Sequence, residues 1–101
     1  MATIIWDPTA LNNLQQVAEY VRSYQPAREQ AFITGMVDKT EQMLRSFPQV
    51  GQRSVTLSQA GREIRTLLLQ KHYRIIYEVH SDEAVTILQL LDVRSAQEPY
   101  W

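Results

Sequence analysis

The sequence predicts an α+β fold: an N-terminal strand, then an antiparallel helical hairpin packed on a three- to four-stranded antiparallel sheet. Two observations lead to this prediction. In the first half of the chain, apolar residues recur every three or four positions, which is the period of a helix with one buried face. In the second half they recur at every second position, which is the period of a strand. Strands that follow a run of helices are typical of the α+β class.

The chain opens with a strand that leads into the first helix. Residues Thr3–Trp6 are β-branched or aromatic, which favours a strand. Asp7 and Pro8 then supply an N-cap and a proline at the first helical position. From Thr9 to about Tyr24, one helical face is apolar and consists of Leu11, Leu14, Val17, Ala18 and Val21. We therefore expect an amphipathic helix over this range.

A second helix is predicted from about Ala27 to Phe47. Pro26 separates it from the first helix, because the residue before a proline is kept out of the helical region. Its apolar face is formed by Phe32, Ile33, Met36, Val37, Met43, Leu44 and Phe47. Pro48 and Gly51 then end the helix. The short connection predicts that the two helices pack antiparallel, as a helical hairpin.

Three strands are predicted after the hairpin, over Ile64–Leu69, Tyr73–His80 and about Ala84–Val93, with a turn at 81–83. In the middle strand, alternation places an apolar set on one face: Tyr73, Ile75, Tyr77 and Val79. We expect the hairpin and the sheet to enclose one core. Its main members would be Leu14, Val17, Val21, Phe32, Met36, Met43, Phe47, Ile75, Tyr77, Ile87 and Leu88.

Length and composition are those of one ordinary globular unit, so a single domain over residues 1–101 is expected. The sequence has no cysteine, which excludes disulfide scaffolds, thiolate metal sites and cysteine nucleophiles. Its first residues contain neither a basic region nor an apolar run of signal-peptide length, and no apolar stretch approaches the ~20 residues of a membrane span. We therefore expect a cytoplasmic protein that does not bind membranes.

The net charge of −1 is unevenly distributed. Residues 53–80 carry five basic and two acidic side chains, whereas residues 81–101 carry one basic and four acidic ones. Basic clusters of this kind are often only a solvated face. The alternative is an acidic or phosphate-bearing partner, which the arginines of this zone suit, because a guanidinium matches the geometry of carboxylates and phosphates.

The residue types that carry chemistry are few. Three glycines are too few for a glycine-rich phosphate loop, and no motif places a carboxylate beside the only histidines, His72 and His80. No serine-hydrolase signature occurs, and we expect neither a metal nor a cofactor. Arg65, Arg74 and Arg94 remain, near strands, as candidates for holding a phosphodiester or an acidic peptide. The alternative is that they pair with acidic residues of neighbouring strands, each pair contributing a few tenths to ~1 kcal/mol.

Several segments resemble the RelE/ParE superfamily of bacterial toxins. They are Trp6–Leu11, Ser46–Gly51, Val85–Leu91 and, as the most specific piece, Tyr73–Val79 with the sequence YRIIYEV. The resemblance extends over essentially the whole chain. It implies a helical hairpin on an antiparallel sheet and a toxin of a type II toxin-antitoxin system. It also implies a cognate antitoxin that neutralises the toxin in a hetero-oligomer.

The resemblance implies one of two targets. RelE-like members cleave messenger RNA in the ribosomal A site, whereas ParE-like members inhibit DNA gyrase without nuclease chemistry. The RelE-like pattern has an arginine after the tyrosine of the central strand, a second arginine after the last strand and a tyrosine six residues later. Arg74, Arg94 and Tyr100 stand at these positions. In a nuclease these three residues and Arg65 would be catalytic. Tyr100 or His72 would protonate the leaving oxygen, and only Glu63 or His80 would be available as general base.

The gyrase inhibitor is the preferred prediction. A toxin that docks into ribosomal RNA gains affinity from many basic contacts, and this chain has two lysines and a net charge of −1. Leucines at 67–69 also stand in the region where RelE-like enzymes carry lysines. Contacts with the target or the antitoxin would come from Arg53, Arg62, Arg65, Lys71, Arg74, Arg94 and Trp101. The ribosome-dependent endoribonuclease is the alternative.

Overall fold

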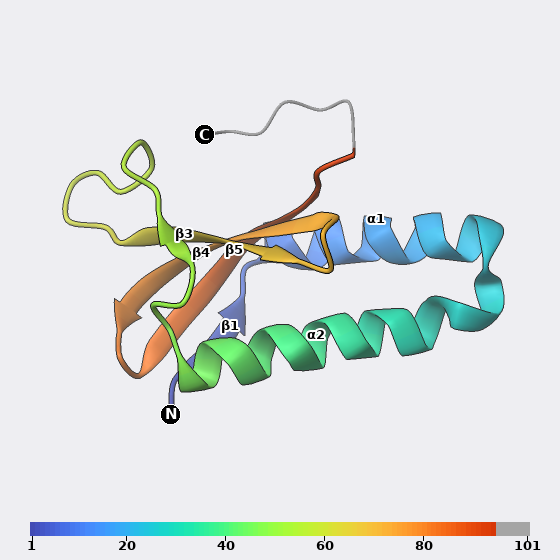
Figure 1. Cartoon of the computed structure of the whole chain (residues 1–101), viewed down its shortest axis with the longest axis horizontal. Helices are drawn as coiled ribbons and strands as arrows, with labels where there is room; N and C mark the ends of the chain where they lie inside the picture. The colour runs from blue at the N-terminus through green and yellow to red at the C-terminus, as the bar shows by residue number, and fades with distance from the viewer. Residues whose placement is uncertain (95–101) are drawn as a thin grey trace.

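The structure is a computed structural model and describes residues 1–94. In chain order its elements are β1 (Thr3–Trp6), α1 (Pro8–Tyr24), the 3₁₀ turn η1 (Pro26–Arg28), α2 (Glu29–Ser46), β2 (Gln52–Arg53), β3 (Ile64–Leu69), β4 (Tyr73–Ser81) and β5 (Ala84–Asp92). The predicted strand–helix–helix–strand order is confirmed, as Figure 1 shows.

The sheet has five strands in the order β1-β5-β4-β3-β2. It is wider than the predicted three or four strands, because the two-residue β2 pairs with β3 and β1 joins the opposite edge. One pairing also differs from the prediction: β1 runs parallel to β5, whereas all other neighbours are antiparallel. Periodicity identifies a strand but contains no information about its partner or direction, which explains the difference.

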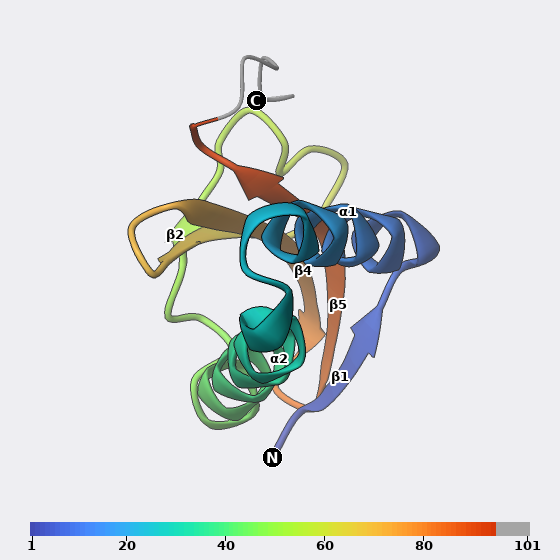
Figure 2. The same ribbon diagram turned by 90° about the vertical axis from the view of Figure 1, so that its right-hand side faces the viewer.

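The two helices lie side by side and extend past the end of the sheet (Figure 1). Figure 2 looks along this hairpin from its tip. Asp7 caps α1 as predicted, since its carboxylate accepts a hydrogen bond from the Thr9 N–H at 3.0 Å. Further along α1, Asn13 accepts a hydrogen bond from the Leu90 N–H at 3.1 Å. The helix therefore continues to protect the edge of β5 beyond the point where β1 ends.

The core lies between the hairpin and one face of the sheet. Most of its predicted members are buried, namely Val17, Val21, Met36, Ile75, Tyr77 and Ile87, and Leu14 and Phe32 pack against them. Phe47 was predicted in the core but is 65% exposed. It is the C-cap of α2, with φ −138° and ψ 76°, so its side chain no longer follows the period of the helix.

Leu88 was also expected in the core, but it is only partly buried. A shift in the β4–β5 register between Ile76 and Tyr77 interrupts the alternation of β5 near this residue. As a result, Ile87 and Leu90 are the buried residues of β5 in this region, and Leu88 lines a cavity on the other side of the sheet. The face away from the helices is called the open face below.

Candidate functional surface

The predicted arginines do not converge on one site. Arg65 lies at the β2–β3 edge, Arg62 pairs with β4, and Arg94 follows β5. Arg74 stands between Leu68 and Leu91 in the strand register. The consequences are different for each arginine.

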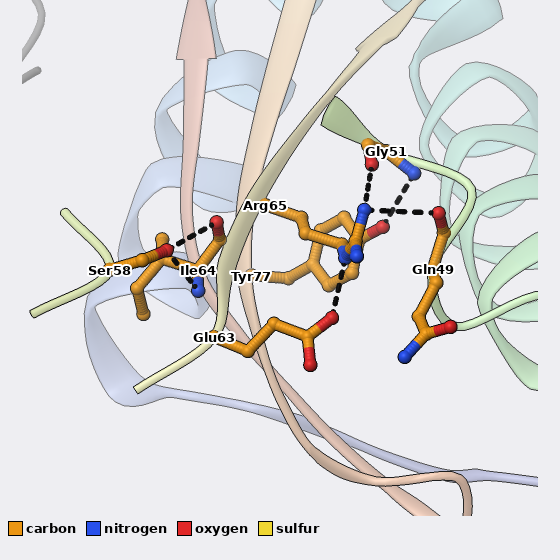
Figure 3. A network of polar contacts seen from close by, with 7 residues as sticks. All are labelled: Gln49, Gly51, Ser58, Glu63, Ile64, Arg65 and Tyr77. Carbon is orange, nitrogen blue, oxygen red and sulfur yellow. Dashed lines mark hydrogen bonds and ion pairs between the residues drawn. The ribbon is translucent and has the colours of Figure 1, made fainter. Parts of the chain in front are cut away.

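Arg65 connects the segment before β2 to the sheet. Its guanidinium donates hydrogen bonds to the carbonyl oxygens of Gly51 at 2.7 Å and Gln49 at 3.2 Å, and it forms an ion pair with Glu63 at 2.7 Å. Figure 3 shows these contacts around one side chain. The Arg65 side chain is only 18% exposed. Its charge and most of its donors are used inside the fold, which is a structural role.

Tyr77 holds the same segment from the core side. Its hydroxyl accepts a hydrogen bond from the Gly51 N–H at 2.8 Å (Figure 3). Burial raises the pKa of Tyr77, and the hydrogen bond from Gly51 offsets part of this effect. A side chain at position 51 would have its Cβ 2.6 Å from the Thr66 carbonyl oxygen, so glycine is required by the close approach of the two backbones.

Arg62 is also paired. Its guanidinium donates to both oxygens of Glu78, at 3.0 and 2.7 Å, in a bidentate ion pair between the 54–63 loop and β4. This pair lowers the pKa of Glu78 against the opposing effect of burial. Arg53 lies on the exposed edge strand β2, opposite Arg65 in the register. The two acidic groups of the basic zone are therefore both used in ion pairs.

The end of the sheet at the β3–β4 turn gathers three predicted contact residues, Lys71, Arg74 and Arg94, which we call the basic end. Lys71 is at the tip of the turn. Arg74 is the second residue of β4, and Arg94 lies near the start of that strand because the Val93 N–H donates to the His72 carbonyl at 2.8 Å. This is the part of the predicted site that the fold brings together.

Within the basic end, Arg94 and Arg74 face different sides of the sheet. The Arg94 guanidinium lies 5.8 Å from the centre of the Tyr73 ring and ion-pairs with Asp92 at 3.1 Å. Tyr73 points to the helices, where it meets Phe32 edge-on at 5.9 Å between ring centres. Adjacent residues of a strand project to opposite faces, so Arg74 belongs to the open face. The two arginines are held apart by the sheet.

The Asp92 carboxylate is the counter-ion of Arg94. Burial raises the pKa of Asp92, but hydrogen bonds from the side chain and backbone of Arg94 outweigh it, so the pKa lies below its usual value. The same hydrogen bond raises the pKa of Arg94. The Arg94 guanidinium therefore has two partners within the chain, the Asp92 carboxylate and the ring of Tyr73.

The candidates for general base lie at the opposite end of the sheet. His80 bonds with Thr86 at 2.8 Å, and the Glu63 carbonyl accepts from the Val79 N–H at 2.9 Å. His80 follows Arg74 by six positions on β4, or about 20 Å at the usual rise. The Glu63 carboxylate is already bound to Arg65. Within residues 1–94, neither candidate base therefore lies at the end of the sheet that carries Arg74 and Arg94.

Two predicted residues, Tyr100 and Trp101, lie outside the described residues. Among residues 1–94, no group of three or more histidine and carboxylate side chains is placed to hold a metal ion. The helices of this same range are also too short or too polar to cross a membrane.

The geometry of the β3–β4 turn is one feature of this surface that the sequence did not predict. Gln70 and Lys71 both have positive φ, 51° and 67°, and the His72 N–H donates to the Leu69 carbonyl. This is a type I′ turn, which glycine and asparagine normally favour. Its signal in the sequence is the three-residue gap between two strands, Gln70 to His72, but the residue types give no indication of the turn.

The fold has solved counterparts. One is described as "Chromosomal ParDE TA system from P. aeruginosa"; it is 18% identical, with a TM-score of 0.73, and the match covers 92% of this chain and 97% of that chain. The likeness shows that both have the same small α+β fold. No curated protein matches the chain.

The family is shown by a match over nearly the whole sequence. The model of the ParE toxin of the type II toxin-antitoxin system parDE matches residues 4–100. The chain therefore belongs to the ParE toxin family, and the predicted toxin role and superfamily are confirmed.

Proposed function

We propose that this ParE-family toxin inhibits DNA gyrase by binding it, without nuclease chemistry, and that a cognate antitoxin neutralises it in a hetero-oligomer. The observation that carries the proposal is the separation of Arg74 and Arg94 onto opposite faces of the sheet, with Glu63 and His80 at its far end. Phosphodiester cleavage needs an acid, a base and charge stabilisation within hydrogen-bond reach of one phosphate. A binding surface has no such requirement. The site of action would be the cytoplasm.

The basic end is the proposed contact surface for the target. Lys71 is exposed in a tight turn in which Gln70 and Lys71 both have positive φ. The Arg94 guanidinium is oriented by its ion pair with Asp92 and by its contact with the Tyr73 ring. A preoriented arginine loses less conformational freedom on binding than a freely moving one. Arg62 and Arg65 are assigned to the fold instead, because their guanidinium groups are occupied by Glu78, Glu63 and backbone carbonyls. Arg53 is left without a role in this proposal.

The test compares two activities of the purified toxin. It is added to a gyrase supercoiling assay and, separately, to translating ribosomes scored for A-site cleavage. We expect inhibition of supercoiling with intact mRNA, and a loss of at least tenfold in potency for Arg74→Ala and Lys71→Ala. Arg45→Ala, on α2 away from the basic end, is the matched control and should keep full potency. Circular dichroism establishes that each variant is folded.

The endoribonuclease is the alternative outcome of this test. Codon-specific cleavage that disappears in Arg74→Ala and Arg94→Ala would refute the gyrase proposal and assign the arginines to phosphate binding. Growth of cells expressing the toxin alone and with the neighbouring small gene tests neutralisation separately. Rescue of growth by that gene is expected, and growth arrest in both cultures would contradict the antitoxin part of the proposal.

A further inference from the structure

A cavity of about 290 Å³ opens on the open face of the sheet, between the start of α1, the 54–63 loop and strands β3 to β5. Its apolar lining comes from Leu57, Ile64, Ile76 and Leu88. Its polar lining comes from Asp7, Thr9, Arg62 and Gln89. It lies at the small end of the size range of ligand sites, which suits a bulky side chain better than a cofactor.

One polar atom in this lining lacks a partner. The Gln89 Oε1 atom is buried and accepts no hydrogen bond from the described residues. Two other polar residues of the lining are engaged: Asp7 accepts from the Thr9 N–H, and Arg62 donates to Glu78. A buried acceptor without a donor destabilises the free chain. The lining therefore combines an apolar depression with one acceptor for an incoming N–H or O–H group.

The wall of the cavity is preformed. Ser58 ties the 54–63 loop to β3, since its hydroxyl donates to the Ile64 carbonyl at 3.0 Å and accepts from the Ile64 N–H at 2.9 Å (Figure 3). The Ser54 N–H donates to the same carbonyl at 2.8 Å. These bonds fix the loop that carries Leu57. An occupant would therefore not have to order the loop on binding, which favours affinity.

We propose that this cavity is an anchor site for the cognate antitoxin: an apolar side chain of an extended antitoxin segment fills it, and an N–H of that segment donates to Gln89 Oε1. The inference rests on the proposed function for its partner. A partner that donates a hydrogen bond to Gln89 Oε1 stabilises the folded toxin for as long as it stays bound. In a toxin-antitoxin system, the antitoxin is the partner that remains bound to the toxin. Ile76 and Arg74 lie on the same face two residues apart, so a segment seated here also covers part of the basic end. Neutralisation would follow from that overlap.

The test measures two properties that should change in opposite directions. In Gln89→Leu the buried acceptor is removed with little change in size, so the melting temperature of the free toxin should rise. The same variant should bind the purified antitoxin at least tenfold more weakly, by calorimetry, and should need correspondingly more antitoxin for release of gyrase. A residue with a purely structural role would not produce this opposition. Gln42→Leu, at an exposed position on α2, is the matched control.

A second variant tests the same cavity in case the Gln89→Leu protein does not fold. Leu57→Ala removes the loop wall of the cavity without touching the sheet and should also weaken antitoxin binding at least tenfold. Wild-type antitoxin affinity in both variants would overturn the proposal, as would loss of gyrase inhibition with antitoxin affinity retained, which would assign the cavity to the target. A wild-type toxin that binds antitoxin but leaves gyrase active would refute the proposed target alone.

Discussion

The Tyr77 hydroxyl in the core accepts a hydrogen bond from the Gly51 N–H at 2.8 Å, although the two residues are 26 positions apart in the sequence. The bond joins the segment after α2 to the central strand of the sheet. On the outer side of this segment, Arg65 holds two carbonyl groups, so the chain is fastened from both directions as it enters β2.

Tyr77→Phe should lower the free energy of unfolding by about 1–3 kcal/mol, because it leaves the buried Gly51 N–H without an acceptor. Urea denaturation followed by circular dichroism measures this change. Tyr20→Phe, which alters an exposed tyrosine, should stay within ~0.5 kcal/mol of the parent. Equal stabilities for the parent and Tyr77→Phe would contradict a role for the bond.

Gly51→Ala and Gly35→Ala should have opposite effects. At position 51 the new Cβ would lie 2.6 Å from a backbone oxygen and 2.7 Å from the Tyr77 hydroxyl, so a loss of about 1–3 kcal/mol is expected. At position 35, inside α2, nothing lies within 4 Å of the new Cβ. Alanine should there add about 0.5–1 kcal/mol through its higher helix propensity. Thermal denaturation of both variants measures these changes. Equal changes in melting temperature at the two positions would contradict the prediction.

Lys71→Gly should stabilise the free toxin and weaken its action. A non-glycine residue at φ 67° costs about 1 kcal/mol, which glycine avoids. Removal of the ammonium group should also reduce inhibition of gyrase if the basic end contacts the target. Lys39→Gly, in the interior of α2, should instead lower stability by about 1 kcal/mol. A destabilised Lys71→Gly protein would show that the turn has no strain to relieve.

Stability should fall in acid partly through Glu78. The hydrogen bonds from Arg62 hold its pKa below the usual value of 4.5, although burial acts in the opposite direction. A carboxylate whose folded-state pKa is depressed contributes stability that is complete above 4.5 and is lost as the pH falls through the folded pKa. In Arg62→Gln this loss should shrink, while Arg28→Gln should keep the parent profile. Urea midpoints between pH 6 and pH 3 provide the comparison.

Much of the fold follows from the sequence alone. The predicted strand Ile64–Leu69 has the bounds of β3, and Asp7 and Pro8 begin α1 where the capping signal places them. These features depend on local backbone geometry: a period of two or 3.6 residues, a capping carboxylate, and a proline that cannot continue a helix. The run Tyr73–Val79, which is the most specific piece of the toxin resemblance, lies in β4, the central strand of the sheet.

The tertiary structure decided which residues of the predicted site can act. From the sequence, Arg65 and Arg74 are equivalent arginines on neighbouring strands, yet Arg65 is used by backbone carbonyls of the segment before β2. Arg74 and Arg94 reach the same end of the sheet but opposite faces of it. Such outcomes depend on strand register, on a bulge in the β4–β5 pair and on contacts between residues far apart in the chain. Local periodicity carries no information about them, because they arise from the packing of elements against one another.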